Sequence, residues 1–546
     1  MPESRNTVPR RTLALVLALA VVAAACTGGG DDDGDEAEEA VTTTATTVTP
    51  TTPTTESEPE PIDPAAGESV ALDECFVDIA IECGTVPVPL DHDDPSAGTI
   101  DIAIGIHRAT SPADRIGYLF VNPGGPGGSG IEYAVAAAFG PDLAFTAEVI
   151  ERFDIVGFDP RGVAESEPAF GCGAAGDQLE LLNQIDGPVD TEAEVDLSER
   201  AAALCVDTLG PAAALLGTAS VARDMDVIRE ALGAEQINYL GASYGSTVGV
   251  FYATLFPERV RAMVVDGADN PVDDLSDEAA RIESALQEIR QFEALLNEAL
   301  LACDTPDCPA YNDGDPIGFY LDQVDDLGLV NEAFADDPTA GGLAVITPLY
   351  SEDTWPELWR GLAALSEGDA QPLIDLAAFQ LLGREPGAAN FTAHVNCLDR
   401  WALHPDFDRA TQLGDRAAVE AAALEELPLL SALDLLTAAD PCPFYDTTVL
   451  AGVDPFDGPL DGSDVPILVI GNRSDPATPF TESAELVDQT LSNGHLVEVD
   501  HPQHVVYPQN PCVNDTIHAV LIDGRFPTGD RTDCPAGVVG DSTPSE

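Results

Sequence analysis

The chain has 546 residues, 45% of them hydrophobic, which is enough to bury a large core in one big domain with an insertion or in two domains. It carries 97 acidic residues against 22 basic ones, all of them arginine, for a formal net charge of −75 at pH 7. A surface this acidic repels nucleic acid and anionic lipid headgroups, so we expect no nucleic-acid partner. A saline habitat and a plain compositional bias explain the charge equally well.

The N-terminus has the pattern of an export signal, to which we assign residues 1–26. Arginines, including Arg10-Arg11, precede an apolar run over 13–25 that is too short for a membrane span. The pair of arginines is compatible with both the general and the twin-Arg export routes. Ala23-Ala24-Ala25-Cys26 follows and resembles a bacterial lipobox, with Ala where that motif prefers Leu. If this motif is processed, Cys26 carries lipid and anchors the protein to the outer face of the membrane. Otherwise cleavage at the same place secretes it.

Residues 27–70 are predicted to be a spacer. They begin with runs of Asp and Glu and continue over 41–61 mostly in Thr, Pro and Glu, a composition that cannot bury a core. We therefore expect an extended, disordered segment that holds the next domain away from the membrane or wall. An acidic binding tail is the alternative.

The cysteines favour disulfides. Eleven are present, and setting Cys26 aside leaves an even number in an exported chain, which is typical of disulfides more than of metal or thiol chemistry. Cys-x-x-Cys is missing, as are His and Cys at zinc-finger spacing, so we expect no metal site. Among about 945 conceivable pairings, joining neighbours in sequence predicts Cys75–Cys83, Cys172–Cys205, Cys303–Cys308, Cys397–Cys442 and Cys512–Cys534.

Residues 71–269 show the first part of an α/β pattern. Alternating isoleucines predict a strand over 99–109, and 117–121 predicts a buried one. The second strand runs into a loop over 122–130 that is rich in Gly and Pro. Such a loop has unusual dihedral angles and exposed N–H groups, as in the oxyanion hole of a hydrolase. A phosphate or dinucleotide loop is the alternative, but neither the Gly-Lys-Ser/Thr ending nor the Gly-x-Gly-x-x-Gly spacing is present.

A Gly-x-Ser-x-Gly pattern surrounds Ser243. A β-favouring run over 237–240 precedes it and a helical apolar pattern follows, which is the context of a nucleophile elbow. Gly241 and Gly245 flank the serine because a Cβ at either position would collide with the neighbouring strand or helix. We therefore predict Ser243 as a nucleophile and the N–H of Tyr244, at the helix start, as an oxyanion donor. About 0.2 chance matches are expected in such a chain, so the pattern needs support from elsewhere.

The next predicted strand covers 153–158, and Asp159 and Arg161 behind it are expected to brace the site as a structural pair. A catalytic Asp159 would come too early in the chain order. Between residues 270 and 464 the pattern changes to Ala-, Leu- and Glu-rich helices, which is too long for a loop and predicts a helical cap. His394 and His404 lie there, and we interpret both as polar packing or surface residues.

Residues 465–546 return to the α/β pattern, with strands over 465–471 and 496–499. Alternating strands and helices predict a mainly parallel sheet that binds its ligands at the carboxyl ends of the strands. Three residues with the chemistry of a catalytic triad lie just after strands: Ser243, Asp475 and His504. Their order along the chain is that of an α/β-hydrolase.

Together these features resemble the secreted actinobacterial α/β-hydrolases of the tripeptidyl aminopeptidase type, relatives of proline iminopeptidase with a TAP-like C-terminal region. The most specific part is the Pro-Gly-Gly-Pro-Gly run at 123–127 ahead of a Gly-x-Ser-Tyr-Gly elbow. The resemblance covers almost the whole mature chain, through the stretches 83–91, 122–130, 153–162, 237–252, 264–271, 466–479 and 497–534. It implies a serine hydrolase fold with a helical cap that cleaves near free peptide N-termini, although some relatives act as esterases.

The resemblance also implies roles for single residues. Ser243 would be the nucleophile, Asp475 the orienting acid and His504 the general base. The N–H groups of Gly125 and Tyr244 would form the oxyanion hole, and no metal or other cofactor would be needed. The family tends to have Gly-His-Gly at the histidine, whereas this chain has Gln-His-Val at 503–505, so His501 stays a competitor. His495 begins a strand and would lie at the wrong edge of the sheet.

The sequence thus predicts an extracellular serine exopeptidase that releases residues or short peptides from free peptide N-termini through an acyl-enzyme, with no membrane contact beyond a lipid anchor. A carboxylesterase acting on lipid or small esters is the first alternative, and a catalytically silent binding protein of the same fold is the second. An exopeptidase must bind an α-ammonium group, and a buried cation needs a carboxylate partner. The acidic residues that follow the strand ending at Asp266 are the candidates: Asp273, Asp274, Asp277, Glu278, Glu283 and Glu288.

Overall fold

The computed structural model describes residues 69–76, 79–141, 143–170, 208–272, 278–334, 339–381, 388–405, 409–433 and 455–535, with a few single positions between them. The predicted export signal, nearly all of the predicted spacer and the Cys172–Cys205 pair lie outside the described residues. Residues 64–546 form one compact unit. Within the described ranges, no helix combines the length and the apolar composition that crossing a bilayer requires.

The centre of the unit is a ten-stranded sheet in the order β1-β2-β3-β5-β4-β6-β7-β8-β9-β10. The pairs β1–β2, β2–β3 and β3–β5 are antiparallel. All later pairs in this order, from β5–β4 to β9–β10, are parallel. The strands are β1 (Asp73–Glu74), β2 (Glu82–Pro89), β3 (Thr99–His107), β4 (Gly117–Asn122), β5 (Phe153–Phe158), β6 (Ile237–Ala242), β7 (Val260–Asp266), β8 (Ile467–Asn472), β9 (Gly494–Val499) and β10 (Arg531–Asp533).

Helices cover both faces of this sheet, which is why its central strands are almost continuously apolar. Alternate residues of β4 show the division, because Phe120 belongs to one apolar cluster and Leu119 to the other. The first cluster takes in α6 (Thr218–Ala231) and α7 (Gly245–Leu255), whereas the second takes in α2 (Gly130–Val135), α3 (Ala147–Arg152) and α18 (Pro511–Leu521). Because the strands from β5 onward run parallel, their carboxyl ends lie at one edge of the sheet, where the loops that follow them meet.

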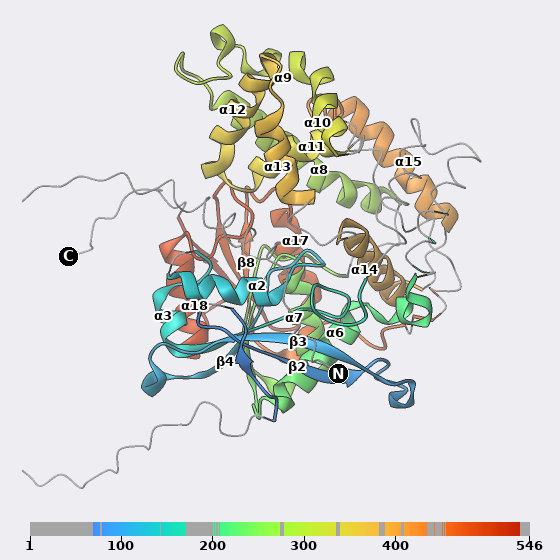
Figure 1. Cartoon of the computed structure of the whole chain (residues 1–546), viewed down its shortest axis with the longest axis vertical. Coiled ribbons are helices and arrows are strands. Elements are labelled where there is room, and N and C mark those ends of the chain that lie inside the picture. The colour runs from blue at the N-terminus through green and yellow to red at the C-terminus, as the bar shows by residue number, and fades with distance from the viewer. Residues whose placement is uncertain are drawn as a thin grey trace, which may run out of the picture. The chain divides into compact units, whose positions relative to one another are not determined.

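A long helical insertion separates β7 from β8, as the sequence predicts. Its helices are α8 (Glu278–Leu301), α9 (Pro316–Gln323), α10 (Gly328–Ala333), α11 (Ala340–Ile346), α12 (Trp355–Ser366), α13 (Gln371–Leu381), α14 (Ala388–Leu403) and α15 (Arg409–Glu426). Helices α8 to α13 pack around an apolar cluster of their own, which includes Leu296, Tyr320 and Leu358 (Figure 1). Helix α14 differs, because its Phe391 and Leu398 are buried in the first cluster of the sheet.

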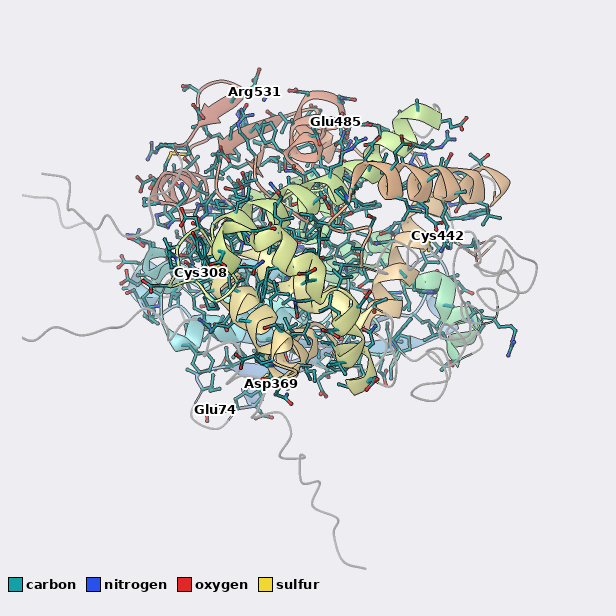
Figure 2. All side chains as sticks on the ribbon, turned by 90° about the horizontal axis from the view of Figure 1, so that it is seen from above. Glu74, Cys308, Asp369, Cys442, Glu485 and Arg531 are labelled. Atoms are coloured by element: carbon teal, nitrogen blue, oxygen red, sulfur yellow. A yellow bond between two sulfur atoms is a disulfide. The ribbon has the colours of Figure 1, made fainter. Side chains whose placement is uncertain are left out.

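Four of the five expected disulfides are present, namely Cys75–Cys83, Cys303–Cys308, Cys397–Cys442 and Cys512–Cys534. Figure 2 labels Cys308 and Cys442 among the side chains. The third bridge ties α14 to a segment 45 residues further along the chain. In the chain-entropy view, closing a loop of that length stabilises the folded state by about 4 kcal/mol.

One expectation about the loop after β5 is wrong. Asp159 and Arg161 are both buried, but each has its own partners instead of pairing with the other. The guanidinium of Arg161 donates to both carboxylate oxygens of Asp224, at 2.7 and 2.8 Å. Asp159 accepts a hydrogen bond from the Ser129 hydroxyl at 2.5 Å. Both residues brace loops, since a buried charge needs a close partner of its own.

Candidate active site

Ser243 sits at the tip of a sharp turn between β6 and α7. Its φ of 54° lies in the left-handed region, which residues with a side chain rarely adopt. Its N–H donates to the carbonyl of Asp266 at the end of β7, at 2.9 Å. A Cβ on Gly241 would lie 2.3 Å from the Gly245 carbonyl oxygen, and one on Gly245 would lie 2.7 Å from the Asn122 carbonyl oxygen. The flanking glycines are therefore required by close backbone contacts.

The residue paired with Asp475 is His504. Its Nδ1 lies 2.8 and 3.0 Å from the two carboxylate oxygens, so Nδ1–H is the donor. In that tautomer Nε2 has a lone pair that can accept a proton. Asp475 is fully buried, and it also accepts the N–H groups of Ala477 and Thr478 at 3.0 and 2.9 Å. The carboxylate is thus held rigidly, and it selects one tautomer of the imidazole.

The strand ends bring the serine and this pair to one place. Gly267 follows β7 directly, and a Cβ there would lie 3.3 Å from both Asp475 Oδ2 and His504 Cε1. Because the residue before Gly267 accepts the amide of Ser243, the elbow and the histidine–aspartate pair share the same edge of the sheet. The structure therefore places Ser243, Asp475 and His504 on loops at the same edge of the sheet.

The competing histidines are placed differently. His501 is buried, and its backbone N–H and carbonyl are both held by the Asn472 side chain, at 2.9 and 2.6 Å. His495 lies near the start of β9, where its Nδ1 is 3.0 Å from the Gly529 carbonyl oxygen. His394 is buried with Nε2 2.7 Å from the Ala213 carbonyl oxygen, and burial lowers its pKa to about 4. Burial lowers the pKa of His404 as well.

The glycine-rich loop after β4 lies directly against the elbow. A Cβ on Gly124 would come within 2.7 Å of the Ser243 Cβ and 3.1 Å of the Tyr244 nitrogen. Gly124 and Gly125 have φ values of 94° and 116°, which only glycine adopts without strain. The Asn122 side chain accepts the Gly124 N–H at 2.9 Å and fixes the start of the loop. Two backbone segments able to present N–H groups therefore adjoin the serine: this loop and the first turn of α7.

The helical insertion also reaches the histidine. The His504 N–H donates to the Tyr350 carbonyl at 2.9 Å, and the two rings meet edge to face with centroids 5.6 Å apart. Tyr350 ends the short helix η9 (Thr347–Tyr350), and the next residue, Ser351, bridges to Gln503. On helix α8, Gln291 donates to the Arg473 carbonyl at 3.1 Å, in the loop that carries Asp475. The loops that hold Asp475 and His504 are thus both in contact with the insertion.

Negative charge is concentrated around His504. Burial disfavours its charged form, but Asp475, Asp269 and Asp266 outweigh that cost and raise its pKa above the ordinary value. Burial raises the pKa of Asp266 to about 7, although the N–H groups of Val506 and Tyr507 bind one of its oxygens. Its other oxygen, Oδ1, is buried without a hydrogen-bond partner.

Glu288 on α8 is the fourth carboxylate in this field. Dense protein surroundings raise its pKa to about 7, and Asp269 raises it further, whereas His504 lowers it. The side chain nevertheless keeps exposed surface, so water reaches it and moderates that rise. Among the other acidic candidates, Glu283 forms an ion pair with Arg290 at 2.7 Å and Glu278 is exposed. The candidates at 273, 274 and 277 lie outside the described residues.

A pocket of about 260 Å³ opens beside the histidine. Most of the residues that line it are apolar or aromatic, and the lining includes Ala242, His504, Tyr133, Leu143, Tyr507 and Pro508. Within the described ranges, no group of three or more His, Cys, Asp or Glu side chains is arranged to hold a metal ion.

Sequence reasoning missed several contacts of this site. Gly267 has a local signal, since a glycine directly after a predicted strand marks a turn or a close approach. Tyr350 and the Asp269–Glu288 neighbourhood have none, because they come from segments separated from His504 by long stretches of chain. Helix periodicity does not reveal which turn of α8 faces the loops of the sheet.

A serine on a strand–turn–helix elbow, a histidine–aspartate pair on the loops after β8 and β9, and a glycine loop against the serine define a serine hydrolase of the α/β-hydrolase fold. Residues 118–311 match the family of the alpha/beta hydrolase fold, and residues 436–534 match the TAP-like protein family. The chain belongs to the tripeptidyl aminopeptidase-like (TAP-like) family of α/β-hydrolases, which confirms the fold and the resemblance inferred from the sequence.

Three relatives illustrate the family. Over 476 residues the chain is 33% identical to serine protease Hip1 of Mycobacterium tuberculosis, a match that covers 82% of this chain and 86% of that protein. It is 30% identical over 500 residues to tripeptidyl aminopeptidase of Streptomyces lividans, covering 86% and 88%. It is also 33% identical over 467 residues to carboxylesterase B of Mycobacterium tuberculosis, covering 82% and 85%.

Proposed function

We propose that this protein is an exported serine exopeptidase that releases short peptides or residues from free peptide N-termini. The observation that carries the proposal is the His504–Asp475 pair, at 2.8 Å, beside a serine held in the left-handed region at an elbow. The relatives named serine protease and tripeptidyl aminopeptidase support a peptide substrate. The relative named carboxylesterase B keeps an esterase as the second candidate.

The mechanism follows from the proposed roles. His504 Nε2 accepts the proton of the Ser243 hydroxyl as its oxygen attacks the substrate carbonyl, and Asp475 stabilises the imidazolium at Nδ1. The N–H groups of Gly125 and Tyr244 bind the oxyanion of the tetrahedral intermediate. His504 then returns the proton to the departing amine and leaves an ester on Ser243. Water, activated by the same histidine, attacks this acyl-enzyme and frees the peptide fragment.

Glu288 is the proposed partner of the substrate's α-ammonium group. It lies on α8 between Gln287, which accepts a hydrogen bond from Thr481 of α17 (Phe480–Glu485), and Gln291, which donates to the loop after β8. Its charge interacts with those of His504 and Asp475. Its own pKa is raised partly because Asp269 repels its charge. An ammonium group beside the two carboxylates relieves that repulsion, so a free N-terminus is favoured there.

The substrate class is tested with three compounds at matched concentration: a tripeptide arylamide with a free N-terminus, its N-acetylated form and a neutral short-chain ester. We expect the free peptide to be cut fastest and acetylation to reduce kcat/KM steeply. Glu288→Gln should reduce kcat/KM for the free peptide and leave hydrolysis of the ester nearly unchanged. Equal cleavage of the free and acetylated peptides would show that the protein does not recognise the α-ammonium group. Turnover of the ester alone would favour the esterase.

The nucleophile is tested separately. Ser243→Ala should reduce turnover to near background and abolish labelling by a fluorophosphonate probe, while leaving the melting temperature close to that of the parent protein. His504→Ala should cost activity by orders of magnitude, whereas His501→Ala and His495→Ala, as matched controls, should cost little. An inactive His501→Ala variant together with an active His504→Ala variant would identify His501 as the general base in place of His504.

We also propose that the protein acts outside the cell, anchored to the membrane by lipid on Cys26. Four disulfides in the described residues fit an oxidising compartment. Cys26→Ser should move the protein from the membrane fraction to the culture medium, with activity per molecule unchanged. A wild-type protein found wholly in the medium would leave simple secretion as the answer.

A further inference from the structure

Helix α14 touches the glycine-rich loop that adjoins Ser243. The Thr392 hydroxyl donates to the carbonyl of Pro126 at 2.6 Å, across 266 residues of sequence. Pro126 directly follows Gly125, the proposed donor to the oxyanion. Glycines at 124, 125 and 127 have positive φ, so this loop has few side chains of its own with which to hold its shape.

The same helix reaches the elbow through a chain of two hydrogen bonds. Asp399 accepts the Thr218 N–H at 2.8 Å and the Thr218 hydroxyl at its second oxygen. Because that hydroxyl donates to the carboxylate, its oxygen accepts from the phenol of Tyr244. Burial, with Asp399 adding to it, raises the pKa of the Tyr244 phenol well above its ordinary value, so the phenol keeps its proton. The chain therefore ends on the residue whose backbone N–H is the other proposed donor.

The two contacts lie on one side of a firmly packed helix. Thr392 and Asp399 are seven residues apart, which in an α-helix is close to two turns and places them on the same face. Between them, Val395 and Leu398 are buried in the first cluster of the sheet, and a disulfide joins Cys397 to Cys442. His394 adds a hydrogen bond to the Ala213 carbonyl. One firmly packed helix thus contacts the glycine-rich loop directly and is linked to Tyr244 through Thr218.

We propose that Thr392 and Asp399 are positioning residues for the oxyanion hole, and that α14 holds the Gly125 and Tyr244 segments at a fixed separation. This inference rests on the proposed function, because it assigns those two N–H groups to the oxyanion. Donors act only when they lie about 2.7–3.1 Å from the oxygen that develops charge. A misplacement of about 1 Å costs up to about 100-fold in rate. The residues named here therefore affect the transition state more than substrate binding.

Two variants each remove one of the hydrogen bonds that link α14 to the two segments. Thr392→Val removes the hydroxyl and keeps the branched shape, and Tyr244→Phe removes the phenol without disturbing how Asp399 holds the start of α6. Each should lower kcat about tenfold or more with KM changed less than about twofold, and Thr392→Ser should restore most of the rate. Thr516→Val is the matched control, since that hydroxyl donates to the Cys512 carbonyl inside α18. It should leave kcat unchanged.

A second readout separates positioning from general stability. A peptide trifluoromethyl ketone adds to the serine and places an oxyanion in the hole, so its affinity should fall by the same factor as kcat/KM in both variants. Asp399→Asn should behave in the same way if it folds. Variants that lose melting temperature but keep kcat and the affinity for the ketone would overturn the inference. Activity surviving in Ser243→Ala would instead overturn the proposed function, so the two failures are distinguishable.

Discussion

His504 is the residue on which most of the electrostatics of the site converge. It contacts Asp475 directly, and the charges of Asp269 and Asp266 also favour its protonated form. A base that must accept a proton from serine works only when it is neutral, so the same carboxylates that hold the histidine also make it harder to deprotonate. The pH profile should reveal this balance.

The acid limb of kcat/KM should therefore lie above pH 6.5, the ordinary pKa of histidine being about 6.5. Activity falls as pH drops through the raised pKa because the imidazolium cannot accept the serine proton. Asp269→Asn removes one negative charge and should move this limb to lower pH. A neutral ester is the substrate of choice, since it has no amine that titrates.

The control for this measurement is Asp533→Asn, which removes the same charge from an exposed position on β10. It should leave the limb where it is. A wild-type limb at or below pH 6.5, unmoved by Asp269→Asn, would contradict the electrostatic account of His504.

At the scale of elements, the site depends on how closely neighbouring loops approach at the end of the sheet. The loops after β6, β7, β8 and β9 meet there, and helices α8 and η9 of the insertion touch the last two. At Gly267 an added Cβ would lie 3.1–3.3 Å from Thr478, Asp475 and His504, which is closer than an ordinary van der Waals contact.

Gly267→Ala should therefore reduce kcat at least tenfold by displacing His504 from Asp475. The added Cβ would lie 3.1 Å from Thr478 Oγ1 and 3.3 Å from His504 Cε1, at a position where φ is 62°. Steady-state kinetics with the ester and a thermal melt measure the effect.

Gly524→Ala is the matched control, since its φ of 66° imposes the same backbone strain while a Cβ there meets nothing within 4 Å. Both variants should lose stability by about 1 kcal/mol, and only Gly267→Ala should lose activity. Equal activity in the two variants would show that close contact at Gly267 does not hold the pair.

At the scale of the molecule, the compact unit holds most of the chain's net charge of −75 against the repulsion between those charges. Two features oppose that repulsion in the described residues: a large apolar core on both faces of the sheet and four disulfides. The negative charge around His504 should favour cationic substrates over anionic lipids.

The protein, expressed without Cys26 in an oxidising compartment, should show no free thiol when it is denatured without reductant. The expectation follows from the four bridges present and from the predicted Cys172–Cys205 pair, which lies outside the described residues. A thiol reagent on the denatured chain measures it, with a reduced sample as the control. Two titratable thiols would place the error at that fifth pair.

The sequence by itself determined the strand–elbow–helix unit at Ser243, the helical insertion after β7 and the order of serine, aspartate and histidine. These features are local, because periodicity, glycine spacing and position after a strand are all visible within a short window. Neighbours in sequence also predicted four disulfides correctly, since short loops bring such cysteines close together.

Only the tertiary structure decided which histidine faces Asp475 and which acidic residue of α8 lies near that pair. It also decided that α14 packs with the sheet. His501 and His504 share one loop and differ only in which way the chain turns, and Glu288 resembles the other acidic residues of its helix. Each choice depends on contacts between segments far apart in the chain, such as Tyr350 with His504 or Thr392 with Pro126. Such contacts arise from how whole elements pack, and no short stretch of sequence contains that information.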